Sequence, residues 1–266
     1  MNANDVALVT GGNKGIGRQI VRRLAQQGLT VYLGARSPER GRSAVRELKR
    51  ESVPVRGGRP AADPGTTGGP DIRFLPLDVT DPRSVEAAVT KIETEVGRLD
   101  VLVNNAGIMV ERGAPTAEIT AAQLRETYEV NVFGVVTMTS ACVPLLRRSP
   151  NPRIVNMSSG LGSLAILSDP ANPLARRAFL AYGSSKAALN ALTLIYANAL
   201  RAEGIKVNAA GPGLVPTDQN AAVPFPRGDR TTADGAVVPA LLATIPADGP
   251  TGVFRGPDSL EDVIPW

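Results

Sequence analysis

The sequence predicts an α/β protein: a single domain built on a doubly wound parallel sheet of about seven strands, with helices on both faces. Short apolar runs alternate along the 266 residues with longer segments of helical periodicity, the pattern of parallel strands joined by crossover helices. A glycine-rich turn follows the first apolar run, and apolar residues make up 43% of the chain. That composition is sufficient for one sizeable core.

The first strand and helix are expected at residues 6–9 and 15–27. Residues 6–9 are all apolar, as in a strand that a parallel sheet buries on both faces. Apolar residues then recur every four positions, which predicts the inner face of a helix, and Gly28 is a suitable stop for that helix.

The alternation continues to the carboxyl end of the chain. Further strands are expected at residues 30–33, 72–77, 101–104, 154–157, 206–209 and 253–255. Further helices are expected at residues 38–50, 84–96, 123–147, 182–203 and 236–243. In such a sheet, ligands bind beyond the carboxyl ends of the strands.

Two stretches interrupt this pattern. Residues 52–71 are rich in Gly and Pro with almost no bulky apolar residues, and we interpret them as a mobile loop insertion. Residues 164–179 form a second insertion that could be either a pocket wall or an exposed loop.

The turn between the first strand and helix has the spacing Gly-x-x-x-Gly-x-Gly, with glycines at 11, 15 and 17. Glycines there allow a tight turn, close approach of the backbone to a pyrophosphate and close helix packing, with the anion at the helix amino terminus. The turn lacks the Gly-Lys-Ser/Thr ending of a P-loop. We expect it to bind a dinucleotide.

Tyr182 and Lys186 are four residues apart in a segment of helical periodicity, so one helix face carries a phenol and an ammonium. A phenol with its ordinary pKa of about 10 is a poor acid-base group at neutral pH. A nearby Lys⁺ favours the phenolate and is expected to lower that pKa. The pair suits proton transfer to or from an alcohol oxygen.

Taken together, the motifs resemble those of the short-chain dehydrogenase/reductase family over nearly the whole chain, and most closely its carbonyl reductase-like branch. The glycine turn resembles that family's Thr-Gly-x-x-x-Gly-x-Gly motif, and residues 104–107 resemble its Asn-Asn-Ala-Gly motif. Further matches occur in the family's order: Asp78-Val79, Asn131, Ser158-Ser159, Tyr182, Lys186, Pro212-Gly213 and Thr217.

The resemblance implies a Rossmann-type fold and assigns catalytic roles. Tyr182 would donate a proton to the carbonyl oxygen, and Ser159, rather than Ser158, would hydrogen-bond that oxygen. Lys186 would hold the cofactor ribose, and Asn131 would position a water that links Lys186 to solvent. Cofactor contacts are expected from Gly11, Asn13, Lys14, Gly15, Ile16, Gly17, Arg36, Asp78, Val79, Asn105, Ala106, Gly107, Tyr182, Lys186, Pro212, Gly213, Val215 and Thr217.

The residue at the end of the second strand indicates which dinucleotide is bound. Arg36 lies 19 positions beyond Gly17, near where an acid would bond the ribose 2′-hydroxyl of NAD. An Arg suits a 2′-phosphate instead, and Lys14 and Arg40 can add positive charge. We therefore expect NADP(H).

The residues beside the motifs predict the substrate. The expected pocket walls are all apolar: Ile108, Met109, Leu161, Leu214 and Val215. A carboxylate left unpaired among them would be costly, so we expect small, neutral, hydrophobic ketones or aldehydes, reduced reversibly to alcohols. The exception would be a cation supplied by Arg176, Arg177 or Arg227. The segment after Thr217 is short for a lid, with only Val223 and Phe225 as sizeable apolar residues.

Composition excludes several classes of function. The chain has no His, so His triads, His metal sites and His proton relays are excluded, and no metal is expected. The net charge is +4, but the basic residues are dispersed among 25 acids and only 4% of residues are aromatic, which argues against nucleic-acid binding.

The cysteine count and the apolar pattern of the chain bear on its compartment. The single Cys142, interpreted as a small core residue, cannot form an internal disulfide, and no apolar run of about 18 residues or signal pattern is evident. We expect a cytoplasmic protein without membrane contact. By the resemblance, it forms a homodimer or homotetramer through the helices bearing Asn131 and Tyr182, with a monomer also open.

Two other functions compete with this prediction. One is a regulatory protein that binds NADP without turnover, although such a protein is not expected to keep the four catalytic residues together. The other is a reductase of 3-ketoacyl groups on a carrier.

Overall fold

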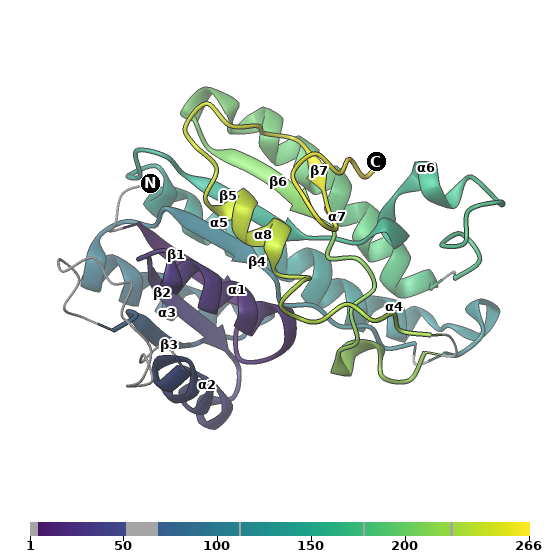
Figure 1. The fold of residues 1–266 in the computed structure, drawn as a ribbon, viewed down its shortest axis with the longest axis horizontal. Helices are drawn as coiled ribbons and strands as arrows, with labels where there is room; N and C mark the ends of the chain where they lie inside the picture. Colours follow the sequence, from purple (N-terminus) through teal and green to yellow (C-terminus); the bar gives the residue numbers. More distant parts are fainter. Residues whose placement is uncertain (1–4, 52–68, 112, 178, 224–225) are drawn as a thin grey trace, which may run out of the picture.

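The computed structural model describes residues 5–51, 69–111, 113–177, 179–223 and 226–266. A seven-stranded parallel sheet runs through the middle of the molecule (Figure 1). Its strands are β1 (Val6–Thr10), β2 (Thr30–Ala35), β3 (Ile72–Pro76), β4 (Val101–Asn104), β5 (Arg153–Met157), β6 (Lys206–Ala210) and β7 (Phe254–Arg255). They lie in the order β3-β2-β1-β4-β5-β6-β7, which confirms the predicted doubly wound fold.

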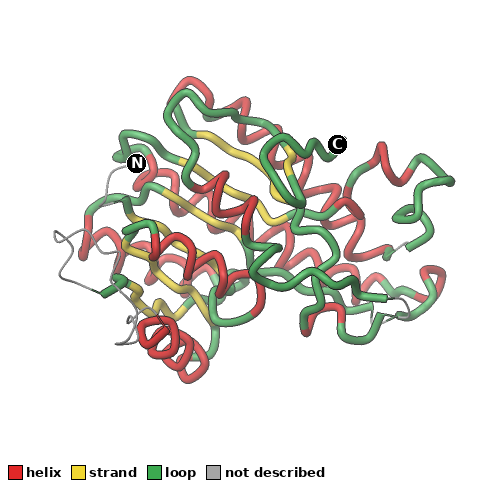
Figure 2. Tube along the Cα trace, in the orientation of Figure 1, coloured by secondary structure: helices red, strands yellow, loops and turns green. Residues whose placement is uncertain are grey.

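Helices cover both faces of the sheet, as Figure 2 shows by the red tubes on either side of the yellow strands. They are α1 (Gly15–Gln26), α2 (Pro38–Glu51), α3 (Pro82–Val96), α4 (Ala121–Tyr128), α5 (Gly134–Leu146), α6 (Leu164–Leu167), α7 (Leu180–Ala199) and α8 (Val237–Ala243). Ala7 and Val9 pack with α1, α2 and α8, whereas Val6 and Leu8 pack with α3, α5 and α7. The two-residue period of β1 thus supplies both halves of the core.

The helix predicted at 123–147 is confirmed as a continuous helical stretch, Ala121–Leu146, but it is not uniform. It consists of α4, a π-helical turn η2 (Glu129–Phe133), and α5. The Gly134 amide bonds the Glu129 carbonyl five residues back, and a Cβ at Gly134 would lie 2.8 Å from the Val79 side chain. The wider turn places Asn131 fully inside the protein. Such π turns occur frequently at functional sites.

The continuous helical stretch Ala121–Leu146 is, by length and composition alone, able to cross a membrane, with a mean hydropathy of 1.5 in its most apolar window. The sequence predicts no such span. Half of the window is buried, and Met138, Cys142 and Leu145 pack in the core beneath the sheet. A core helix has this composition for reasons of packing, and the absence of membrane contact stays a prediction.

The two predicted insertions differ in what the structure shows. Residues 52–68 lie outside the described residues. The segment predicted at 164–179 forms the short helix α6 followed by turns. Residue 178 of this segment lies outside the described residues. Ile166 and Leu174 pack over Gly160, whose Cβ would lie 3.6 and 3.2 Å from them. The segment therefore covers the strand end that carries the predicted catalytic Ser159.

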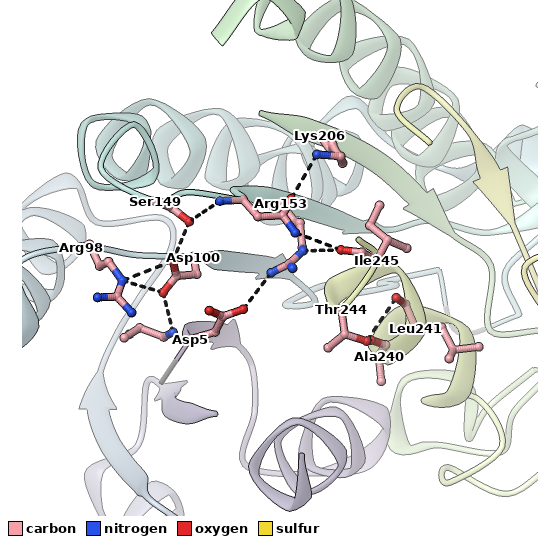
Figure 3. Close-up of polar contacts among 12 residues, drawn as sticks. Asp5, Arg98, Asp100, Ser149, Arg153, Lys206, Ala240, Leu241, Thr244 and Ile245 are labelled. Carbon is pink, nitrogen blue, oxygen red and sulfur yellow. Dashed lines mark hydrogen bonds and ion pairs between the residues drawn. The ribbon is translucent and has the colours of Figure 1, made fainter. Parts of the chain in front are cut away.

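A buried polar cluster occupies the opposite edge of the sheet, at the amino ends of the strands (Figure 3). The Arg153 guanidinium lies 3.2 Å from the Asp5 carboxylate and donates to the Ile245 carbonyl at 2.9 Å. The Asp100 carboxylate accepts from the Val6 amide at 2.7 Å and from the Ser149 hydroxyl. These contacts join β1, β4, β5 and the segment after α8, and they give the buried charges hydrogen-bond partners.

Candidate active site

The glycine turn lies where the strand order reverses between β1 and β4. Gly11 and Gly15 have φ values of +63° and +56°, which residues with a side chain rarely adopt. A Cβ at Gly17 would lie 2.3 Å from the Asn105 amide nitrogen, so only Gly lets α1 approach the end of β4 this closely. The amino end of α1 is thereby held against the Asn-Asn-Ala-Gly motif.

Hydrogen bonds join the two motifs. The Thr10 hydroxyl accepts from the backbone amides of Asn105 and Ala106 at 3.0 and 2.9 Å. The Asn105 side-chain amide donates to the carbonyl oxygens of Thr10 and Gly11, at 2.8 and 3.2 Å. The Asn105 side chain thus links the ends of β1 and β4, and Asn105 also lines the adjoining cleft.

A cleft of about 1070 Å³ opens along this edge of the sheet. Thirteen of the predicted cofactor residues line it. Twelve lie at or near the ends of β1, β2, β3 and β4, and Thr217 lies in the loop after β6. They are Gly11, Asn13, Lys14, Gly15, Ile16, Gly17, Arg36, Asp78, Val79, Asn105, Ala106, Gly107 and Thr217. The amino end of α1 borders the cleft with no side-chain cap and no acid in its first turn. Its free amides can bind an anion, so the residues present fit a dinucleotide pyrophosphate.

Two of the predicted phosphate-binding cations line the cleft. Arg36 is exposed there at the end of β2. The Lys14 ammonium lies 2.8 Å from the Asp218 carboxylate and holds the pKa of that carboxyl below its ordinary value. Both partners are largely exposed, so the pair is weak and Lys14 can turn to a phosphate. Arg40 is not among the described lining residues.

A smaller cavity of about 130 Å³ adjoins the cleft. It is lined by Ser159 just after β5, by Tyr182 and Lys186 on α7, and by the loop after β6. That loop also carries four predicted cofactor residues: Pro212, Gly213, Val215 and Thr217. The fold therefore brings three of the four predicted catalytic side chains to one cavity, from the end of β5 and from α7.

The electrostatics of the Tyr–Lys pair differ from the sequence prediction. Burial raises the pKa of Tyr182, and contacts with the Gln219 and Ser159 side chains oppose that rise only in part. The Lys186 ammonium donates to the Met157 carbonyl at 2.7 Å and lies 5.6 Å from the centre of the Tyr182 ring. Burial lowers the pKa of Lys186 itself to about 8. The predicted net lowering of the Tyr182 pKa is therefore wrong here, because desolvation outweighs the two side-chain hydrogen bonds that favour the phenolate.

The two neighbouring serines have different environments. The Ser158 hydroxyl is buried and donates to the Asn190 side chain at 2.5 Å. Both serines line the cavity, but only Ser159 has a side-chain contact with Tyr182 among the described interactions. Its hydroxyl also accepts from the Leu161 amide at 3.2 Å. This arrangement favours Ser159 over Ser158 for the role at the carbonyl oxygen.

Asn131 does not line either space among the described residues. Its side chain accepts from the Ile108 amide at 2.9 Å, and donates to the Ile108 carbonyl at 2.9 Å and to the Ser185 hydroxyl at 3.0 Å. Gly107 separates it from the cleft, since a Cβ there would lie 3.3 Å from the Asn131 oxygen and 3.7 Å from the Lys186 nitrogen. Asn131 therefore braces the site, and its link to a water stays a prediction.

Four of the five predicted pocket walls line the small cavity: Met109, Leu161, Leu214 and Val215. Ile108 instead lines the larger cleft. Val223 lines the cavity, and Phe225 lies outside the described residues. Sequence reasoning missed Gln219, which lines both spaces and contacts Tyr182 from a short turn after Thr217. No motif marks that position, because loop conformation alone brings it there.

Comparison with known proteins identifies the family. The family model described as short chain dehydrogenase matches residues 5–225. The chain belongs to the short-chain dehydrogenase/reductase family. It is 31% identical to a (+)-neomenthol dehydrogenase of Capsicum annuum, with 93% of this chain and 94% of that protein covered. These matches make it an oxidoreductase of the carbonyl reductase-like branch.

Solved short-chain dehydrogenase/reductase structures have the same architecture. The structure of salutaridine reductase from Papaver somniferum aligns with a TM-score of 0.74 at 30% identity, covering 94% of this chain and 99% of that one. A short chain dehydrogenase from Shigella flexneri, solved in complex with NADP, aligns with a TM-score of 0.75 at 25% identity, covering 94% and 95%.

Proposed function

We propose that the protein is an NADPH-dependent reductase that converts small, neutral, hydrophobic ketones or aldehydes to alcohols. The observation that carries this proposal is the small cavity in which Tyr182 and Ser159 meet an otherwise mostly apolar wall beside the dinucleotide cleft. A carbonyl oxygen there would find a proton donor and a second hydrogen-bond donor together.

The side chains divide the chemistry as follows. Bound NADPH would supply the hydride to the carbonyl carbon. Tyr182, whose raised pKa keeps the phenol protonated at neutral pH, gives its proton to the carbonyl oxygen. Ser159 donates a hydrogen bond to that oxygen as its charge grows. Lys186 places a positive charge behind Tyr182, and Asn131 holds the surrounding backbone.

NADP rather than NAD is favoured by charge. Arg36 and Lys14 both border the cleft, and a guanidinium suits a 2′-phosphate through paired, charge-assisted hydrogen bonds. The NADP complex of the Shigella flexneri relative supports the same choice.

A neutral substrate is favoured by the cavity lining. Lys186 is the one charged side chain among the described residues that line the cavity, and its ammonium is already bonded to the Met157 carbonyl. Arg176, Arg177 and Arg227 are not in that described lining. An ionised substrate would thus lose its hydration without a matched partner. The relatives named for neomenthol and for salutaridine support a small organic substrate.

The test is a substrate panel followed by the absorbance of NADPH. Neutral cyclic and aryl ketones are compared with 2-keto acids and with carrier-linked 3-keto esters, using the parent and Tyr182→Phe. We expect turnover of the neutral ketones, lost in Tyr182→Phe while NADPH affinity is kept, since the phenyl ring still packs. Preference for carrier-linked esters would indicate a ketoacyl reductase instead, and NADPH binding with no turnover would indicate a regulator.

We further propose a cytoplasmic location and a homodimer or homotetramer. Cys142, the one cysteine of the chain, is buried and unpaired, in keeping with a reducing compartment.

Exposed apolar side chains on the helices that carry the predicted subunit contacts support an assembly. Among them are Phe133, which is 52% exposed, and Ile195, which is 61% exposed. Light scattering of the purified protein measures its mass directly.

A further inference from the structure

The catalytic helix α7 begins without a cap from its own sequence. Its N-cap residue is Phe179, which has no side-chain acceptor, and no acid occurs in its first turn. The Gly183 amide is the first to bond back, to the Phe179 carbonyl at 2.8 Å. The preceding amides of the first turn therefore need acceptors from elsewhere in the protein.

Glu111 supplies two of those acceptors from a distance of 70 residues in sequence. One carboxylate oxygen accepts from the Ala181 amide at 2.8 Å, and the other accepts from the Tyr182 amide at 2.9 Å. The residue is only 2% exposed. A carboxylate at the amino end of a helix bonds both to the amides and to the positive end of the helix dipole, which compensates for its desolvation.

Glu111 also ends the segment that follows β4 along the cofactor cleft. Residues 107–110 line that cleft. Asn131 bonds both backbone groups of Ile108 and the Ser185 hydroxyl, which itself donates to the Tyr182 carbonyl at 2.7 Å. Two sets of hydrogen bonds thus connect the segment to α7, one through Glu111 and one through Asn131 and Ser185. Both backbone polar groups of Tyr182 take part: its amide bonds Glu111 and its carbonyl bonds Ser185.

We propose that Glu111 is a positioning residue for carbonyl reduction, whose carboxylate holds the first turn of α7 and thereby places Tyr182 beside the cofactor cleft. This inference rests on the proposed function. Because one Glu111 oxygen bonds the amide of Tyr182 itself, loss of the carboxylate shifts the residue that donates the proton. A misplacement of about 1 Å can lower a rate by about 100-fold.

The experiment compares Glu111→Gln and Glu111→Ala with the parent at 25 °C. Gln keeps the shape and one acceptor but turns an NH₂ group towards the second amide, so kcat should fall about tenfold, and about 100-fold in Glu111→Ala. The NADPH Kd should change by about threefold at most, because most of the expected cofactor contacts come from the glycine turn and the strand ends rather than from the first turn of α7. Asp81→Ala is the matched control, because Asp81 caps α3 by accepting from the Arg83 amide at 3.0 Å.

The control separates positioning from stability. Asp81→Ala should lower Tm to a similar extent as Glu111→Gln with kcat unchanged. Parental kcat in Glu111→Ala, or an equal loss of kcat in the control, would overturn the inference. If the parent reduces no carbonyl, the proposed function fails, but amide hydrogen exchange still tests the role of Glu111 at the start of α7. Faster exchange of the Ala181 and Tyr182 amides in Glu111→Gln supports that role. Unchanged exchange refutes it.

Discussion

Replacement of Gly17 by Ala tests whether close packing of the glycine turn holds the cofactor site together. The added Cβ would lie 2.3 Å from the Asn105 amide nitrogen and 2.5 Å from the Gly11 carbonyl oxygen, about 1 Å short of an ordinary 3.4 Å contact. Neither neighbour can yield freely. The Asn105 amide donates to the Thr10 and Gly11 carbonyls, and the Gly11 oxygen is main chain.

The magnitude follows from these contacts. Overpacking costs about 1–3 kcal/mol, and a lost hydrogen bond adds about 1 kcal/mol. The free energy of unfolding should therefore fall by about 2–4 kcal/mol, which lowers Tm by roughly 4–16 °C for a chain of this size. If the displaced turn loses one charge-assisted bond to the pyrophosphate, the Kd for NADPH should rise on the order of 10- to 100-fold.

Thermal unfolding and NADPH fluorescence titration measure the two effects, with Gly28→Ala as control. Gly28 has φ +87° but nothing within 4 Å of its added Cβ, so that variant pays only backbone strain of about 1–2 kcal/mol. It should lose stability and keep its NADPH affinity. A Gly17→Ala protein that binds NADPH within twofold of the parent would refute the reasoning, whatever its Tm.

Two further predictions concern charge in the cleft. Arg36→Asp should weaken NADP binding by about 1.5–3 kcal/mol or more and improve the relative use of NAD, measured as the ratio of kcat/KM for the two cofactors; a parent that already prefers NAD would contradict this. Because burial lowers the pKa of Lys186 to about 8, its ammonium loses its proton as pH rises through 8, so kcat/KM for NADPH should fall above about pH 8. A flat profile between pH 7 and 9.5 would remove Lys186 from cofactor binding.

The sequence by itself determined the sheet, the cofactor cleft and most of the predicted site. These features rest on local chemistry: an apolar run such as that of residues 6–9 predicts a buried parallel strand, and Gly11 and Gly15 supply a turn that other residues resist. Because the strands pair in parallel, their carboxyl ends lie on one edge of the sheet. Residues at those ends, Arg36 and Ser159 among them, line the cleft or its adjoining cavity as expected.

Only the tertiary structure decided the electrostatics and support of the catalytic side chains. The sign of the Tyr182 pKa shift depends on how deeply the phenol is buried, which spacing along the chain does not specify. The π turn at Asn131 depends on Gly134 packing against Val79. The cap from Glu111 joins residues 70 positions apart. Sequence periodicity reports which face of an element is buried, whereas these features depend on which distant groups meet once the elements have packed.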